Sequence, residues 1–320
     1  MRAPSLRLAA FLSLILLAVA TTGRAAPADD GFWKLWGDGK AELSAFALTE
    51  PRYGAPRAGT AVLVFVTEDF SDSLRVKADP GKHPAGDVYP VVKLNAVRDF
   101  QTGIYDYNLM SSVFARADRL AGDASGAVVK TSFSAQEWCG HVYQQWLRHG
   151  DKLDGVAHSY FDGEADQAPV LDYPAGGLLE EALPIVLRGL RGDLLAPGER
   201  RTVPFLPSTM RARLSHRPQA WGHATLTRST ETRPVSTALG KLDAFTITVD
   251  EPGGPTTTWT LEAAAPHRIL AWSSPDGESA TLLGSARLPY WQLHDPGNES
   301  YLKQLGLPPP TAPRATAKKK

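Results

Sequence analysis

The chain has 320 residues, of which 34 are basic and 34 are acidic, and a single cysteine, Cys139. A lone cysteine cannot form an intrachain disulfide, so packing must stabilise the fold. Residues 1–25 hold three of the basic residues, and the C-terminal tail holds four more, Arg314 and the three lysines at 318–320. Without these two segments, 27 basic and 34 acidic residues remain. This acidic balance argues against binding to nucleic acid, whose phosphates require a basic surface, and against binding to anionic membranes by charge.

The first 25 residues have the three-part pattern of a secretory signal peptide. A short basic segment precedes an apolar run from Leu8 to Ala20, and small residues follow. The run is shorter than the roughly 20 residues that a membrane span needs. We therefore expect cleavage after Ala25, or alternatively after Ala20, and an exported protein of the periplasm or extracellular space with no transmembrane span after cleavage. An uncleaved anchor is the alternative.

Alternating apolar residues predict β-strands along most of the remaining chain. Residues 62–66 are apolar at every position, which is typical of a strand covered on both faces. Residues 245–250 and 258–262 alternate apolar with polar side chains, which indicates strands with one wet face. Further strands are expected near 40–49, 59–68, 90–97, 103–117, 127–134, 137–147 and 155–163. The C-terminal third is expected to form an antiparallel meander, with turns at 251–255 and 274–277.

One clear helix is predicted, from Leu178 to Leu190. Glu180 and Glu181 fall in its first turn, and Arg188 and Arg191 near its end, as the helix dipole favours. Pro184 is expected in its first two turns or at a kink, because proline lacks a backbone donor. A single helix among many strands can bury its apolar side most simply on the hollow side of a curved sheet.

The predicted fold is therefore mainly β. We expect a large curved antiparallel sheet, an open half-barrel, with one main helix on its concave side. Residues 27–307 are expected to form one large domain, and a division into two lobes near 165–200 is the alternative. Residues 308–320 contain four prolines and end in three lysines, which predicts a disordered tail.

A thiol, an imidazole and a carboxylate occur together at Cys139, His141 and Glu137, and they are the only candidates for catalysis. In a strand, the three side chains share one face at about 7 Å between successive members, too far for a thiol–imidazole hydrogen bond. In a helix, Glu137 and His141 pair and Cys139 points elsewhere. Because cysteine is often buried, a packing role for Cys139 is favoured over a nucleophile.

No cofactor or metal site is predicted. The eight histidines form no pair at metal-ligand spacing, and the chain contains no HExxH motif, no phosphate-binding loop and no Gly-x-Ser-x-Gly motif.

The aromatic side chains are candidates for an apolar binding site. The candidates are Trp138, Trp259, Trp272, Tyr290 and Trp291. Packing in the core is the simpler role for such side chains, and the lining of an apolar cavity is the functional alternative.

The chain resembles a family of exported bacterial proteins of uncharacterised function that are often labelled septum formation inhibitor. The resemblance covers nearly the whole mature chain, and the matching stretches are Phe32–Leu43, Asp99–Asn108, Gln136–His141 and Pro289–Trp291. The label implies a cytosolic α/β nucleotide pyrophosphatase, which fits neither the strand pattern nor the leader. The segment from Trp259 to Tyr290 also resembles, weakly, exported β domains with the fold of the periplasmic lipoprotein carrier. That resemblance implies an open sheet with a helix in its hollow, and an apolar ligand.

Three functions follow as hypotheses. The first is an exported, non-enzymatic protein that binds an apolar or amphipathic ligand of the lipid or lipoprotein type. The second is a thiol-dependent hydrolase or transferase that uses Cys139. The third is a cell-envelope scaffold that binds protein partners through sheet edges or aromatic patches.

Overall fold

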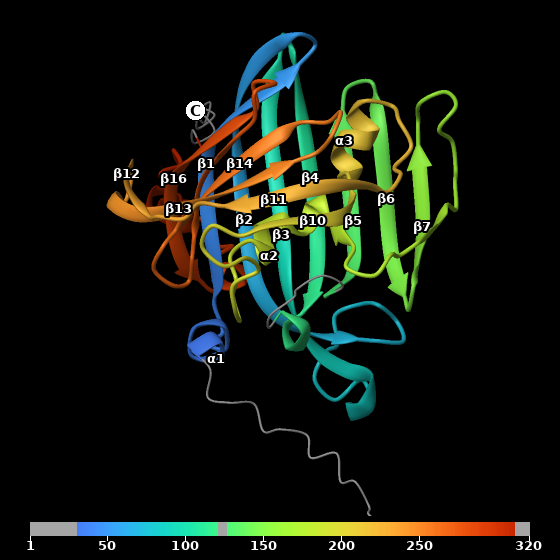
Figure 1. Ribbon diagram of the computed structural model, residues 1–320, viewed down its shortest axis with the longest axis horizontal. Helices are drawn as coiled ribbons and strands as arrows, with labels where there is room; N and C mark the ends of the chain where they lie inside the picture. The colour runs from blue at the N-terminus through green and yellow to red at the C-terminus, as the bar shows by residue number, and fades with distance from the viewer. Residues whose placement is uncertain (1–30, 121–126, 311–320) are drawn as a thin grey trace, which may run out of the picture. The chain divides into compact units, whose positions relative to one another are not determined.

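The computed structural model describes residues 31–120 and 127–310 (Figure 1). The predicted signal peptide, and the predicted tail from residue 311 onward, lie outside the described residues. The described residues belong to one compact unit that begins at Gly31. Among them, no helix has both the length and the apolar character needed to cross a bilayer.

The described residues form sixteen strands and a few short helices. The strands of the N-terminal half are β1 (Ala41–Arg52), β2 (Ala55–Ser71), β3 (Val88–Thr102), β4 (Tyr105–Arg116), β5 (Val128–Glu137), β6 (Gly140–His149), β7 (Lys152–Ser159) and β8 (Val170–Asp172). Those of the C-terminal half are β9 (Leu178–Leu179), β10 (Arg200–Leu206), β11 (Gly222–Arg228), β12 (Arg233–Thr237), β13 (Gly240–Asp250), β14 (Thr256–Glu262), β15 (Ile269–Ser273) and β16 (Ser279–Leu288). The α-helices are α1 (Gly31–Trp36), α2 (Leu183–Val186) and α3 (Thr209–Leu214), and the 3₁₀ helices are η1 (Ala85–Asp87), η2 (Ala117–Arg119), η3 (Glu180–Ala182), η4 (Tyr290–Gln292) and η5 (Asn298–Leu305).

All sixteen strands belong to one open sheet, which confirms the predicted mainly β fold. The order runs from β8 through β1 to β16 and on to β9, with β12 paired to β13 beside this path. Strands β8 and β9 are the two ends of the order and do not pair with each other, so the sheet is not closed into a barrel. Strand pairing is antiparallel, except that β9 and β10 are parallel.

Strand β2 is covered on both faces, as its continuous apolar run predicts. Leu63 and Phe65 pack in the main hydrophobic core, whereas Val64 and Val66 pack with Leu305 of η5 on the opposite face. The alternation of the pleat places these two sets on opposite sides. Helix η5 therefore covers the outer face of the sheet at this point.

The C-terminal meander has the predicted turns. Strands β13, β14, β15 and β16 pair in order as antiparallel neighbours. Gly277 donates its backbone N–H to the carbonyl oxygen of Ser274 at 3.1 Å and has a φ of 104°, a conformation that favours glycine. This turn brings Asp276 and Glu278 to the same end of the sheet.

The long helix predicted from Leu178 to Leu190 is wrong. Leu178 and Leu179 form strand β9, a 3₁₀ turn follows, and helix α2 extends only from Leu183 to Val186. Pro184 is confined to the start of α2 because it lacks a backbone donor, and Gly189, with a φ of 57°, leaves the helical conformation soon after it. Every residue of α2 is buried, so the segment has no wet face.

Segment 178–195 lies between the two halves of the sheet. Its buried leucines share one hydrophobic core with residues of β2, β3 and β4 and with residues of β13, β14 and β15. In Figure 1, α2 and strands β10 and β11 lie in front of β3 and β4. The two halves of the sheet therefore face each other across this segment. The segment thus occupies the concave side of the sheet, where the main helix is expected.

Candidate functional site

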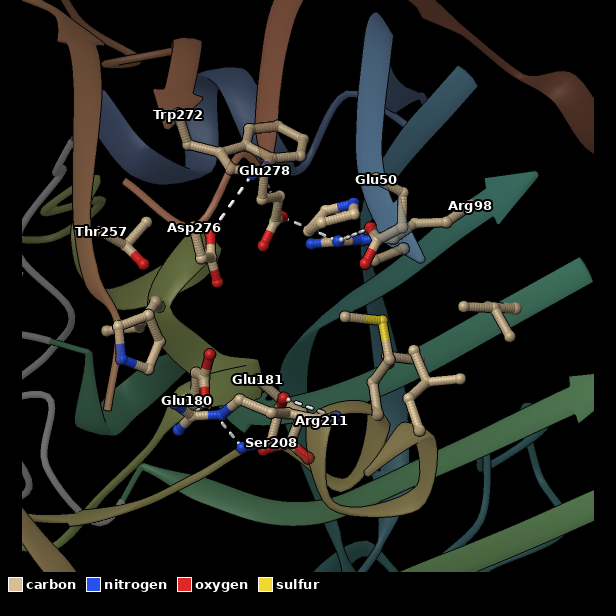
Figure 2. Close-up of a pocket in the computed structure, with 18 of the residues that line it drawn as sticks. Glu50, Arg98, Glu180, Glu181, Ser208, Arg211, Thr257, Trp272, Asp276 and Glu278 are labelled. Atoms are coloured by element: carbon tan, nitrogen blue, oxygen red, sulfur yellow. Dashed lines mark hydrogen bonds and ion pairs between the residues drawn. The ribbon is translucent and has the colours of Figure 1, made fainter. Parts of the chain in front are cut away.

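The candidate site is a cavity of about 300 Å³ between the two halves of the sheet. Strands β1, β3 and β4 contribute to one side, β14, β15 and the turn before β16 to another, and η3, α2 and α3 to its floor. Figure 2 shows charged side chains on opposite sides of the open space. Five carboxylates and three guanidinium groups line it: Glu50, Glu180, Glu181, Asp276 and Glu278, and Arg52, Arg98 and Arg211.

The first charged group joins distant strands through Arg98. The Nη1 atom of Arg98 on β3 donates to Glu50 Oε2 at 2.9 Å and to Glu278 Oε1 at 2.8 Å. Glu278 Oε1 also accepts the indole N–H of Trp272 at 2.7 Å, and the guanidinium of Arg98 lies 5.6 Å from the centre of the Trp272 ring. One arginine thus connects β1, β3 and the β15–β16 turn.

The second charged group fixes the start of helix α3. Glu180 Oε2 accepts the backbone N–H of Ser208 at 2.7 Å and pairs with Arg211 Nη2 at 2.8 Å. Glu181 Oε1 accepts the backbone N–H of Thr209. Because the first backbone N–H groups of a helix lack intrahelical partners, two glutamates of η3 satisfy donors that would otherwise be open. Arg211 also pairs with Glu251 Oε2 at 2.6 Å.

Burial changes the acidity of these carboxyl groups. Burial raises the pKa of Glu181 to about 7, although the backbone N–H of Thr209 opposes the shift. Burial also raises the pKa of Glu50 and of Glu180, against the opposing effects of Arg98 and Arg211. Carboxyl groups with raised pKa values in a cavity are typical of functional sites.

Two buried polar atoms at the cavity have no partner among the described residues. One is Oε2 of Glu181, whose side chain lines the cavity in a residue that is only 8% exposed. The other is the indole N–H of Trp259, a residue that is 7% exposed and also lines the cavity. A buried polar group without a partner costs free energy, so each of these atoms requires a physical explanation.

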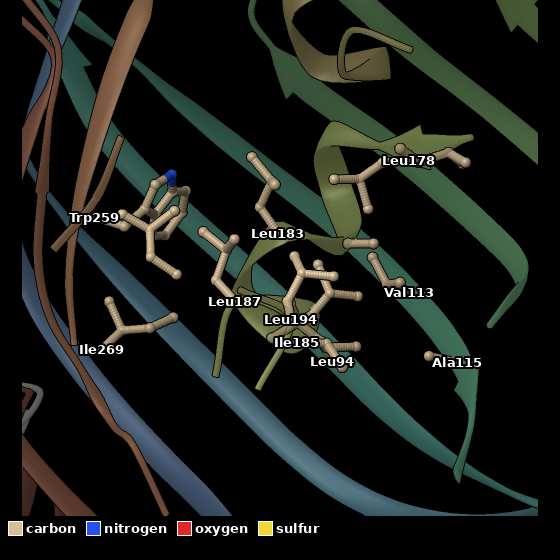
Figure 3. Packing of buried hydrophobic residues seen from close by; sticks show 14 of the residues in the cluster. Leu94, Val113, Ala115, Leu178, Leu183, Ile185, Leu187, Leu194, Trp259 and Ile269 are labelled. Atoms are coloured by element: carbon tan, nitrogen blue, oxygen red, sulfur yellow. The ribbon is translucent and has the colours of Figure 1, made fainter. Parts of the chain in front are cut away.

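The rest of the lining is apolar. It includes Leu109, Leu183, Pro184, Met210, Trp259 and Trp272. The rings of Trp259 and Trp272 stack with their centres 5.4 Å apart and an interplanar angle of 27°. Two of these lining residues, Trp259 and Leu183, also belong to the main hydrophobic core. Figure 3 shows them together with Leu187, Ile185 and Leu194 of the same core. The cavity thus combines an apolar part with charged walls.

The predicted aromatic candidates lie at three separate places. Trp259 and Trp272 line the cavity. Trp138 is 69% exposed in the turn between β5 and β6, where its ring lies 6.3 Å from that of Tyr105. Tyr290 and Trp291 lie in η4 after the last strand, with ring centres 5.4 Å apart. The fold therefore brings two of the five candidates together.

Cys139 and His141, the thiol and imidazole considered as catalytic candidates, form no hydrogen bond with each other. Cys139 is exposed in the β5–β6 turn, so the prediction that it packs in the core is wrong. Its backbone N–H donates to Glu137 Oε2 at 2.9 Å, and the hydrogen bond and charge of Glu137 raise the pKa of the thiol. His141 lies on β6. A raised pKa disfavours the thiolate, which is the nucleophilic form.

The charged groups of the cavity are absent from the sequence predictions. Glu180 and Glu181 are predicted only as first-turn residues of a helix, whereas in the structure Glu181 is buried and both carboxylates accept backbone N–H groups at the start of α3. The only local signal is that the pair follows two apolar residues and precedes a buried run. Glu50, Arg98 and Glu278 are far apart in sequence, and nothing in their local patterns indicates that they meet.

Among the described residues, no group of three or more histidine, cysteine, aspartate or glutamate side chains has an arrangement that could hold a metal ion. Comparisons with protein-family models, curated proteins and solved structures found no significant match to the chain.

Proposed function

We propose that this chain is an exported, non-enzymatic protein that binds an amphipathic ligand in the cavity between the two halves of its sheet. The observation that carries the proposal is the mixed lining of the cavity, where the stacked rings of Trp259 and Trp272 lie beside buried carboxylates. Ligand pockets typically combine an apolar lining with a few placed polar groups. Export is inferred from the leader pattern of residues 1–25.

The arrangement of charges supports binding rather than thiol chemistry. The guanidinium of Arg98 engages two carboxylates and that of Arg211 engages two more, which fixes the walls of the cavity. A preformed wall reduces the ordering cost of binding. The only cysteine lies at a hairpin turn and its thiol has a raised pKa.

The proposal is tested with N-phenyl-1-naphthylamine, a neutral apolar dye whose fluorescence rises in apolar surroundings. We expect the purified protein to bind the dye, and expect Ala96→Phe to abolish binding because Ala96 lines the cavity. Ala47→Phe is the matched control, since Ala47 is exposed on strand β1 and does not line the cavity. Ser111→Phe, at another lining position, replaces Ala96→Phe if that variant does not fold.

Native mass spectrometry of protein isolated from the cell envelope provides the second test. A co-purifying molecule that is retained by Ala47→Phe and lost from Ala96→Phe is the expected result. Dye binding that is equal in wild type and in folded cavity-filling variants contradicts the proposal.

A further inference from the structure

The cavity has more acidic than basic groups in its lining. Five carboxylates face three guanidinium groups there. Arg98 and Arg211 are both engaged by carboxylates, and Arg52 donates to the carbonyl oxygen of Leu214 at 2.8 Å and to the hydroxyl of Tyr107. The basic groups of the lining therefore already have partners, and they leave an excess of negative charge.

Two buried atoms indicate where a ligand would complete the site. Oε2 of Glu181 is an acceptor without a donor, in a residue that is more than nine-tenths buried. The indole N–H of Trp259 is a donor without an acceptor and is buried to the same degree. These two observations are independent of the count of acidic residues, because one concerns a single oxygen and the other an aromatic side chain.

The aromatic rings beside these atoms are also suited to a positive charge. An ammonium or guanidinium group is attracted to the face of an indole ring, most strongly where water is excluded. In this cavity the guanidinium of Arg98 already lies over Trp272, and Trp259 stacks on the same ring. Indole rings beside carboxylates are the surroundings in which organic cations bind to proteins.

We infer that the ligand of this cavity is an amphipathic organic cation, with an ammonium group that donates to Glu181 Oε2 and an apolar part that packs against Trp259 and Leu183. A hydrogen-bond acceptor near the ammonium group would satisfy the indole N–H of Trp259. The inference rests on the proposed function and specifies its ligand class.

The test compares three probes that share one tail and differ in the charge of the head group: octylammonium, octanol and octanoate. Calorimetric titration is carried out at pH 8 and below the concentration at which each probe aggregates. We expect octylammonium to bind at least about tenfold more tightly than octanol and octanoate, which corresponds to one charge-assisted hydrogen bond.

Substitutions locate the effect. Glu181→Gln keeps the shape and the acceptor for Thr209, and we expect it to weaken octylammonium binding about tenfold without changing octanol binding. Asp276→Asn is the second variant. It removes one negative charge from the lining at an exposed turn position, so the change does not alter a buried group. Glu231→Gln, in an exposed loop outside this cavity, is the matched control and should leave all three affinities unchanged.

The outcomes separate the two proposals. If octanol or octanoate binds as tightly as octylammonium, the inference is wrong while the proposed ligand-binding function stands. Octylammonium affinity that is unchanged in folded Glu181→Gln also overturns the inference, and if Glu181→Gln does not fold, unchanged affinity in Asp276→Asn overturns it. If none of the three probes binds and no dye binds either, the proposed function itself is wrong.

Discussion

Arg188 and Glu42 form a buried ion pair that joins the end of the α2 segment to strand β1. Their Nη1 and Oε1 atoms are 2.8 Å apart, and Nη2 donates to Oε2 at 3.0 Å. The Nε atom of Arg188 donates to the carbonyl oxygen of His267 at 3.1 Å, and the guanidinium lies 4.6 Å from the centre of the Phe65 ring. This pair holds the segment that forms the floor of the cavity.

The first prediction concerns this pair. Arg188→Ala or Glu42→Ala is expected to lower the free energy of unfolding by about 3–5 kcal/mol, because either change leaves the other charge buried without its partner. Chemical denaturation followed by circular dichroism measures the change. Lys152→Ala provides the comparison, since Lys152 and Asp172 form an exposed pair whose removal should change the stability far less. If Arg188→Ala lowers the free energy of unfolding no more than Lys152→Ala does, the structural role of Arg188 is contradicted.

The second prediction concerns pH and Glu181. Burial raises the pKa of Glu181 from 4.5 to about 7, so between these values the folded protein binds a proton that the unfolded chain releases. Stability therefore falls as pH rises through this range, by at most about 3 kcal/mol. Glu181→Gln is expected to remove this contribution.

The measurement is the difference in unfolding free energy between wild type and Glu181→Gln from pH 4 to pH 8. Glu50 and Glu180 are also buried and have raised pKa values, so the comparison with wild type subtracts most of their contribution from that of Glu181. Glu181→Gln should gain stability relative to wild type as pH rises. A difference that does not change with pH would show that Glu181 titrates normally.

The third prediction concerns the contact between strand β16 and helix η5. A Cβ atom added at Gly284 would lie 2.5 Å from the carbonyl carbon of Leu305, which is backbone and cannot rotate away. Gly284→Ala should therefore destabilise the protein by about 1–3 kcal/mol and expose η5 to limited proteolysis. Gly86→Ala is the control, because a Cβ at that position meets nothing within 4 Å. Intact η5 in Gly284→Ala would contradict this close approach.

The fourth prediction concerns the exposed thiol. Because the hydrogen bond and charge of Glu137 raise the pKa of Cys139, the folded protein should react with iodoacetamide at pH 8 more slowly than a free thiol does. Glu137→Gln should increase the rate by increasing the thiolate fraction, whereas Glu231→Gln should have no effect. Faster labelling of wild type than of Glu137→Gln would support the thiol-dependent alternative instead.

The course of the strands could be predicted from local patterns because each strand carries its own period of two. The continuous apolar run at Val62–Val66 indicated a strand covered on both faces, and the structure supplies the core on one face and Leu305 on the other. The helix near Leu178 could not be predicted correctly. Its apolar residues fit a helix, but pairing of Leu178 and Leu179 with β10 replaces its first turn, and Pro184 and Gly189 limit the rest.

The sequence by itself determined a mainly β fold and, with one cysteine, a chain that has no intrachain disulfide, because these depend on composition and on patterns within a few residues. Only the tertiary structure decided the cavity. Glu50, Arg98 and Glu278 meet across 48 and 180 positions of the chain, and Glu181 loses its water when the two halves of the sheet face each other. Burial and long-range pairing set the charge and hydrogen bonding of these groups, and neither property is present in any local segment.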